Sequence, residues 1–399
     1  MRIALFPALL TFIITCFSGC SSSDKQPYSY PSQNISGQLP HLITNKTDDA
    51  LYLSWVEKID DSTYFYFSEW STDRWSDPIL ISKGTDWFVN WADYPMISVN
   101  QSGAMQAHYL QKSSSGTYSY NVKLVQSENG VDWIELGAIH NDGTPTEHGF
   151  VSHIVRPDST YQVAWLDGRQ TNASHEGHSH GGGAMTLRTA LVDPNGKISE
   201  RTELDNRTCD CCQTTGTWTD QGAVIAYRDR SDLEIRDIYV VRQTPEGWSE
   251  PKPVWNDGWQ IEGCPVNGPR ITSKGNQVAI AWYTAAQNKP TVKVSFSQDA
   301  GENFGEPVVL DSDNPIGRVD IVSLDENRVA VSWLAGDGSI QLAIYDQLKG
   351  LVSKQGIASS SIERSAGFPQ LEKLNQSLFL AWTVSDSLGY SIRTQQIPL

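Results

Sequence analysis

The chain has little positive charge and no sign of long helices. Its 399 residues include 30 Lys and Arg against 46 Asp and Glu, and the basic residues form no cluster. An acidic protein without a basic patch is a poor partner for a phosphate backbone, which excludes nucleic acid as a ligand. Apolar residues alternate with polar ones and do not recur at helical spacing, so a helical fold is excluded as well.

An apolar run long enough to span a membrane is also missing. The one sustained run, Ile3 to Phe17, is shorter than the ~20 residues that a spanning helix needs. With Arg2 before it, this run is typical of a secretory signal, so we expect a signal peptide over residues 1–19 and a tether over residues 20–27. Phe17-Ser18-Gly19-Cys20 resembles a bacterial lipobox. The resemblance implies a lipid on Cys20 and anchoring in the cell envelope, at the outer membrane, facing the periplasm or the exterior; simple secretion is the alternative.

Cysteine is scarce, and its distribution is uneven. Two of the six cysteines lie in the N-terminal stretch, and the other four are Cys209, Cys211, Cys212 and Cys264. Disulfides persist outside the cytoplasm, and four cysteines can pair as two bridges in three ways. Two disulfides are therefore one interpretation, and a thiolate site for Cu(I) or zinc is the other. The absence of a Cys-x-x-Cys-His motif excludes covalently attached c-type haem.

What the chain does contain is a repeat of about fifty residues. A short apolar strand with an aromatic residue near its end recurs seven times. The copies begin at Leu51, Met105, Tyr161, Ala223, Val278, Val329 and Leu378. Candidate strands flank each copy, and four-stranded units at this period are typical of β-propeller blades. We predict an all-β fold, a single β-propeller over residues 28–399 with seven four-stranded blades; six blades, or a pair of β-sandwiches, are the alternatives.

The repeat also predicts how the blades pack and how the ring closes. The recurring aromatic residue is expected at equivalent buried places between blades in the five copies that carry tryptophan. These residues are Trp55, Trp165, Trp282, Trp333 and Trp382. The last unit ends near Ile397 without a fourth strand. We expect Tyr28 to Ser36 to supply that strand and close the ring.

The turn between third and fourth strands carries a family resemblance. Ser297-Gln-Asp299-Ala-Gly301-Glu-Asn-Phe304 fits the Asp-box pattern Ser-x-Asp-x-Gly-x-x-aromatic, and Ser127-Glu-Asn129-Gly130-Val-Asp-Trp133 is a shortened version. The chain thereby resembles the sialidase superfamily. The resemblance implies a propeller in which this turn is structural, with the Asp side chain bonding N–H groups of the turn, and lies away from the active face.

Propeller connectivity divides the loops between two faces. Loops that join a fourth strand to the next first strand share a face with loops that join second and third strands. Leu204 to Gly216, with three of the cysteines, and Trp259 to Gly268 therefore lie on one face. Binding sites are commonly built from such loops. The candidate ligand-binding residues on this face are Asp167, Arg169, Trp259 and Asn267.

Arginine and aspartate residues supply the candidate catalytic groups. They are Arg228, Asp229, Arg236, Asp237, Arg270 and Arg318. An arginine cluster suits a carboxylate-bearing ligand because the guanidinium group can bind it in a bidentate manner. The resemblance implies three arginines on a sugar carboxylate, with Arg270 and Arg318 at the starts of first strands and Arg228 or Arg236 as the third.

The resemblance is incomplete at the catalytic positions. Leu39-Pro40-His41-Leu42 stands where the family has Arg-Ile-Pro, and no Tyr/Glu nucleophile pair can be assigned. Arg–Asp pairs that hold loops together are therefore the alternative interpretation. A separate tract, His175-Glu176-Gly177-His178-Ser179-His180, precedes three glycines. His175, His178 and His180 could bind copper or zinc, or they could form a solvated loop insertion.

Three functions remain open at this stage. The first is a glycan-directed enzyme or binder, with exo-sialidase-like hydrolysis by paired carboxyl groups as its finer form. The second is a metal-binding or redox site on the Cys and His loops, and the third is a scaffold for a partner protein. No cofactor is required by the first function, whereas the second implies a transition metal. We expect a monomer.

Overall fold

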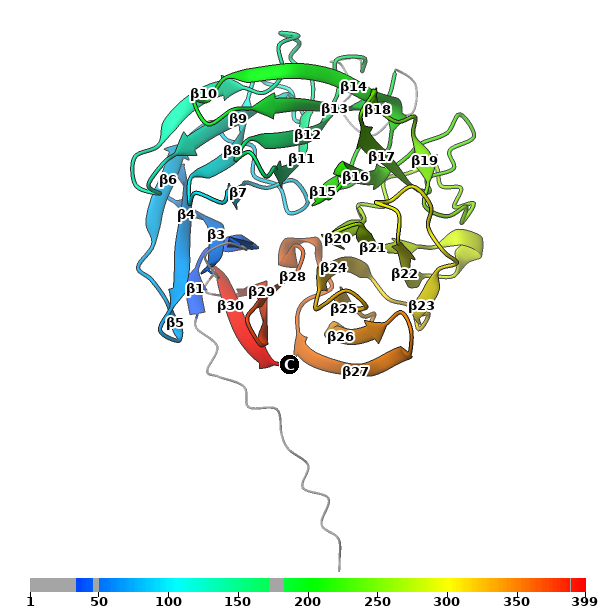
Figure 1. The fold of residues 1–399 in the computed structure, drawn as a ribbon. Coiled ribbons are helices and arrows are strands. Elements are labelled where there is room, and N and C mark those ends of the chain that lie inside the picture. Colours follow the sequence, from blue (N-terminus) through cyan, green and yellow to red (C-terminus); the bar gives the residue numbers. More distant parts are fainter. Residues whose placement is uncertain (1–33, 46–49, 172–182, 388) are drawn as a thin grey trace, which may run out of the picture.

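The computed structural model describes residues 34–45, 50–171, 183–387 and 389–399. These residues form seven antiparallel sheets arranged around a central axis (Figure 1). The fold is the predicted all-β, seven-bladed propeller. In the described part of the chain, no helix is long and apolar enough to cross a membrane.

Each blade begins at the axis and continues outward. The innermost strands are β2 (Gln38–Asn45), β7 (Met96–Val99), β11 (His148–Val155), β15 (Thr215–Thr219), β20 (Arg270–Lys274), β24 (Gly317–Ser323) and β28 (Gln370–Leu374). The second strands are β3 (Ala50–Ile59), β8 (Met105–Lys112), β12 (Tyr161–Asp167), β16 (Gly222–Arg228), β21 (Gln277–Thr284), β25 (Arg328–Leu334) and β29 (Ser377–Asp386). Every second strand thus contains one of the seven repeated apolar segments.

The outer half of each blade follows the same order. The third strands are β4 (Ser62–Ser71), β9 (Tyr120–Ser127), β13 (Met185–Val192), β17 (Ile238–Thr244), β22 (Thr291–Ser297), β26 (Ser339–Asp346) and β30 (Gly389–Pro398). The fourth strands are β6 (Ile79–Gly84), β10 (Ile134–Ala138), β14 (Ile198–Thr208), β19 (Lys252–Pro253), β23 (Val308–Asp311), β27 (Gly350–Ser359) and β1 (Asn34–Ser36). Two short strands, β5 (Arg74–Trp75) and β18 (Gly247–Trp248), and two 3₁₀ turns, η1 (Ala286–Asn288) and η2 (Arg364–Ala366), complete the elements.

The ring closes as the sequence predicts. β1 pairs antiparallel with β30, placing Asn34 opposite Arg393 and Ser36 opposite Ser391. The seventh blade is therefore built from both ends of the described chain, which lie side by side in Figure 1. Residues 28–33 of the predicted closing segment lie outside the described residues.

The repeated tryptophans pack each blade against the one before it. All five lie on second strands and are at most 5% exposed. Trp333 of the sixth blade, for example, packs in a cluster with Val292 and Val294 of the fifth, and Trp55 of the first blade packs with Phe379 of the seventh. This interblade burial was predicted from the repeat and is confirmed.

The Asp-box turn has the structural role that the resemblance implies. The Asp299 carboxylate accepts hydrogen bonds from the Ser297 hydroxyl at 2.7 Å and from the Asn303 backbone N–H at 2.9 Å. Gly301, at φ 81°, donates its N–H to the Ser297 hydroxyl at 2.9 Å. Phe304 packs against the cluster shared by the fourth and fifth blades. The turn therefore closes the outer end of the fifth blade.

Candidate functional site

A cavity of about 150 Å³ lies on the propeller axis. All seven innermost strands contribute residues to it, so its walls come from every blade. Its polar and charged lining includes His41, His153, Arg270, Asp320, Gln370 and Glu372. A smaller cavity, lined by Asp93, Tyr94, Phe150, Gln213 and Arg270 among others, lies next to it. Because Arg270 borders both spaces, it is the charged residue that they share.

Arg270 has few partners for a buried guanidinium. Its side chain is 14% exposed, and its Nε lies 4.0 Å from Asp320 Oδ1. Its Nη2 donates one hydrogen bond, to the Tyr94 hydroxyl at 3.3 Å. The Asp320 carboxylate is itself held by the N–H groups of Ile321 and Leu371 at 2.9 and 2.8 Å. Among the described residues, Arg270 thus makes one of the five hydrogen bonds that a guanidinium can donate, and it lines both cavities.

Asp93 brings a second unusual group to the smaller cavity. The Tyr120 hydroxyl lies 2.8 Å from Asp93 Oδ2 and 2.7 Å from Glu147 Oε1. One phenolic hydrogen can make a full hydrogen bond to only one of the two carboxyl groups, so protonation of the other would satisfy both contacts. Burial raises the pKa of Asp93 to about 7, against the opposing effect of hydrogen bonds from Phe150 and Tyr120. Asp93 is therefore a carboxyl group that can donate or accept a proton near neutral pH.

Three of the four predicted catalytic arginines donate hydrogen bonds to other groups of the protein. Arg228, 1% exposed, donates to the carbonyl oxygens of Arg236, Asn267 and Tyr283. Arg318 donates to the carbonyl oxygens of three residues in the loop before β28, Ile362, Glu363 and Gly367.

Arg236 has side-chain partners. It donates to the Cys209 sulfur at 3.2 Å and to the Glu234 carboxylate at 2.7 Å. The structure therefore brings Arg228 and Arg236 together, but it leaves Arg270 as the arginine that lines the axial cavities.

The predicted aspartates lie next to these arginines, outside the axial cavities. Asp237 accepts hydrogen bonds from the N–H groups of Gly258 and Trp259 at 2.9 and 3.0 Å. Burial, followed by the charge of Asp205, raises the pKa of Asp229 to about 7. The Tyr227 hydroxyl also bonds to Asp205. Asp205 and Asp229 are therefore neighbouring carboxyl groups, of which the sequence analysis named only Asp229.

The four predicted ligand-binding residues pack into the same face. The Arg169 guanidinium donates two hydrogen bonds to the buried Asp167 carboxylate, with both N–O distances at 2.7 Å. The Trp259 ring lies under Arg228, 4.9 Å from its guanidinium carbon. Asn267 accepts the backbone N–H of Arg318 at 2.7 Å with its side chain. The polar groups of Asp167, Arg169 and Asn267 are thus bonded within the protein.

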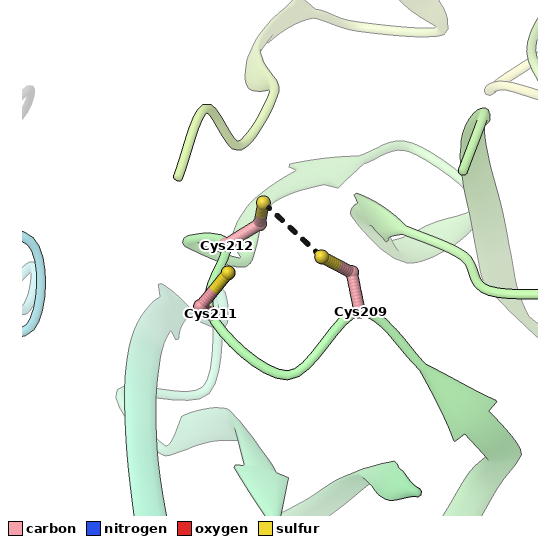
Figure 2. A group of neighbouring side chains, drawn as sticks. All are labelled: Cys209, Cys211 and Cys212. Atoms are coloured by element: carbon pink, nitrogen blue, oxygen red, sulfur yellow. Dashed lines mark hydrogen bonds between the residues drawn. The ribbon is translucent and has the colours of Figure 1, made fainter. Parts of the chain in front are cut away.

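The three clustered cysteines meet in the loop between β14 and β15 (Figure 2). Cys209, Cys211 and Cys212 are at most 5% exposed, and their sulfur atoms all lie within 4.8 Å of one another. The sulfur atoms of Cys209 and Cys212 are 3.4 Å apart. Cys211 also hydrogen-bonds to Cys264, which is half-buried. The predicted bridge between the triplet and Cys264 is absent, because all four of these cysteines are free.

The interpretation as two disulfides is not what the structure contains. All four described cysteines are free, and a sulfur–sulfur separation of 3.4 Å is well beyond the ~2.05 Å of a disulfide bond. Burial opposes ionisation of Cys209. Hydrogen bonds from Cys211 and Cys212 and the charges of Arg236 and Arg228 nevertheless hold its pKa well below the usual range. Burial and the hydrogen bond to Cys209 raise the pKa of Cys211 and Cys212.

A second group that could hold a metal was missed from the sequence. His140, Asp142 and His148 lie in and beside the loop between β10 and β11, and their ligand atoms fall within 4.8 Å of one another. The Asp142 carboxylate is 2.8 Å from His140 Nδ1 and 3.3 Å from His148 Nε2. The sequence did contain a signal for this group: a His-x-Asp motif followed by a histidine at the start of the next strand. The predicted His175, His178 and His180 lie outside the described residues, as does Cys20.

Comparison with known proteins is informative about the fold. No family model matches the chain, and no curated protein matches it either. Among solved structures, the BP39L lectin from Burkholderia pseudomallei aligns with a TM-score of 0.60 at 12% identity, covering 92% of this chain and 99% of the lectin. A PL25 ulvan lyase aligns with a TM-score of 0.56 at 14% identity, covering 93% and 95%.

A sialidase is also similar in fold. The Hadza microbial sialidase Hz136 aligns with a TM-score of 0.54 at 12% identity, covering 86% of this chain and 74% of the sialidase. At these identities the likeness shows the fold alone, which is the β-propeller that the repeat predicted.

Proposed function

We propose that this chain binds an acidic glycan, and that Arg270 holds the carboxylate of its terminal sugar in the axial cavity. The observation that carries the proposal is a buried arginine that donates one hydrogen bond and borders two cavities. A guanidinium in this state is complementary to a carboxylate, which it can bind through two parallel hydrogen bonds. Similar propellers include a lectin, a sialidase and a polysaccharide lyase, which agrees with a glycan as the ligand.

The size and lining of the axial cavity favour one sugar ring. Its volume of about 150 Å³ equals that of an engineered protein cavity that accommodates a benzene ring. Gln370 and Glu372 line the same cavity and can bond sugar hydroxyl groups. Asp93, beside Arg270 in the smaller cavity, adds a carboxyl group that is partly protonated near neutral pH. The end of a glycan therefore fits better than the middle of a polymer.

We propose binding, with sialidase-type hydrolysis as the less favoured activity. Hydrolysis by the mechanism of that family needs three arginines on one carboxylate. Arg228 and Arg318 donate to backbone carbonyl oxygens, and Arg236 donates to Cys209 and Glu234. Turnover of a sialoside by the purified protein, lost in Arg270→Gln, would establish hydrolysis in place of simple binding.

The test is calorimetric titration with N-acetylneuraminic acid and D-glucuronic acid, using their methyl esters as uncharged counterparts. We expect an acid to bind, and Arg270→Gln to weaken binding at least about 30-fold. Removing one partner of a buried charge pair costs 2 kcal/mol or more, and 1.4 kcal/mol is tenfold. Arg328→Gln is the matched control because Arg328 is an exposed arginine paired with Asp325. Equal binding of acid and ester, unchanged binding by Arg270→Gln, or no binding of either acid would refute the proposal.

The proposed location follows from the N-terminal residues. We propose that Cys20 is lipidated and tethers the propeller in a bacterial envelope. Cys20→Ser should abolish incorporation of labelled fatty acid and shift the protein from the membrane to the soluble fraction. Cys16→Ser, a neighbouring cysteine in the apolar run, should leave both unchanged. Labelling that persists in Cys20→Ser would contradict this part of the proposal.

A further inference from the structure

The sulfur cluster beside β14 and the glycan site are separate. None of the four cysteines lines the axial cavities, so the proposed function leaves the cluster without a role. The cluster is built by the local fold. The Cys209 N–H donates to the Arg228 carbonyl at 3.0 Å, and the side chain of Gln213 bonds to both Ala92 and Gly268. Because both ends of the loop are fixed in this way, the loop backbone holds the three sulfur atoms close together.

We propose that Cys209, Cys211 and Cys212 bind one Cu(I) ion, with Cys264 as a further sulfur at the rim. Thiolates are the ligands that select soft ions such as Cu(I). With a metal–sulfur distance of ~2.3 Å, three sulfur atoms around one ion lie about 4.0 Å apart. The observed sulfur atoms all lie within 4.8 Å of one another, the closest pair at 3.4 Å. Shifts of several tenths of an ångström therefore suffice to enclose the ion.

The surroundings of the cluster exclude harder ions. The nearby carboxylates have other partners: Asp210 bonds to Arg230 and to the Met185 N–H, and Glu234 bonds to Arg230 and Arg236. The donor set is thus sulfur alone, whereas Ca²⁺ and Mg²⁺ require oxygen ligands.

Charge favours the monovalent ion over zinc. Three thiolates bound to one Cu(I) ion carry a net charge of −2, and two neighbouring arginine side chains can balance this charge. Arg236 contacts the Cys209 sulfur at 3.2 Å, and the charge of Arg228 acts on Cys209 and Cys212. A closed four-sulfur zinc site would need the half-buried Cys264 to join at tetrahedral geometry. The cysteine spacings of one and zero residues also differ from the two or more that zinc sites usually have.

The experiment is an anaerobic titration of the reduced full chain with Cu(I), with bathocuproine disulfonate as the competing ligand. We expect one Cu(I) per chain. Cys209→Ala and Cys212→Ala should each weaken binding at least about 100-fold, whereas Cys264→Ala should weaken it about 10-fold or less. Near-ultraviolet circular dichroism of each variant checks that the propeller is folded.

A measurement on the parent protein covers the case in which a variant unfolds. X-ray absorption of the copper-loaded parent should show sulfur ligands only, at about 2.2–2.3 Å. Oxygen or nitrogen ligands at the copper, or a second ion per chain at equal affinity, would overturn the assignment. So would binding that both alanine variants retain, tighter binding of Zn²⁺ at the same sulfur atoms, or a Cys209–Cys212 disulfide in the exported protein. None of these outcomes bears on binding of sugar acids at Arg270, so the two proposals fail independently.

Discussion

Acidification should destabilise the ring through the histidines at its axis. His153 lines the axial cavity, and its Nε2 lies 2.9 Å from His108 Nδ1. Burial lowers the pKa of His153 to about 3, while an unfolded histidine has a pKa of about 6.5. Between these values the unfolded chain binds a proton that the folded chain does not. The stability contribution is therefore complete above pH 6.5 and is lost as the pH falls toward 3.

The expected magnitude follows from that difference. Each pH unit below 6.5 costs about 1.4 kcal/mol, so a fall from pH 7 to pH 5 costs up to about 2 kcal/mol. Because His153 borders a water-accessible cavity, we expect about 1 kcal/mol. Asp93 and Asp229 act in the opposite direction. Their folded pKa values of about 7 add stability as the pH falls from 7 toward 4, since protonation then favours the folded state.

Because these effects oppose one another in the parent protein, a comparison between variants tests the contribution of His153 most directly. His153→Asn removes the titrating ring. Burial is the main cause of the lowered pKa of His41 and His108, and the variant also removes the smaller contribution that His153 makes to both. We compare the free energy of unfolding, measured with urea, at pH 7 and at pH 5. Its decrease on acidification should be at least about 1 kcal/mol smaller in the variant than in the parent. Ser98→Ala, which changes a cavity residue without a charge, should behave like the parent. An equal or larger acid loss in His153→Asn would refute the reasoning.

The remaining predictions concern the stability of the ring. Trp333→Ala should lower the free energy of unfolding by about 3–5 kcal/mol because Trp333 is fully buried, whereas Trp255→Ala, at 38% exposure, should cost under ~1 kcal/mol. Asp299→Ala should cost roughly 1–2 kcal/mol through its lost turn bonds, measured by the same urea unfolding. A chain starting at residue 37, which lacks β1, should be roughly 1–3 kcal/mol less stable than one starting at residue 34; equal stability of the two would contradict the pairing of β1 with β30.

The architecture was predictable because it is repeated in local sequence. Each second strand carries its own alternation and its own aromatic residue, so a strand such as the one ending at Trp282 can be recognised without knowing its neighbours. The sequence also showed that the last unit lacks a fourth strand of its own. The prediction that an N-terminal segment supplies this strand correctly placed Ser36 beside β30. Burial between blades then followed from geometry, because a single blade cannot bury both of its faces.

The roles of the arginines could not be predicted in this way. Arg228 donates to the carbonyl oxygens of Asn267 and Tyr283, which lie 39 and 55 residues further along the chain. Every residue carries a carbonyl oxygen, so such acceptors leave no signal in the sequence. Arg270, which lines two cavities, cannot be distinguished by sequence from Arg318, which donates to backbone carbonyl oxygens. Tyr94 and Asp93 were missed for a related reason, since their importance depends on proximity to Arg270 across several blades.

The pairing of β1 with β30 also fixes the order in which the protein can mature. Asn34 is synthesised long before its partner Arg393, because the whole propeller lies between them in the sequence. Until then, the first blade presents Trp55 without the Phe379 side chain against which it packs. Contacts this distant in sequence are slow to form, and incomplete sheets with open edges are prone to aggregate. We therefore expect a nascent chain to depend on protection from aggregation until β30 has been released.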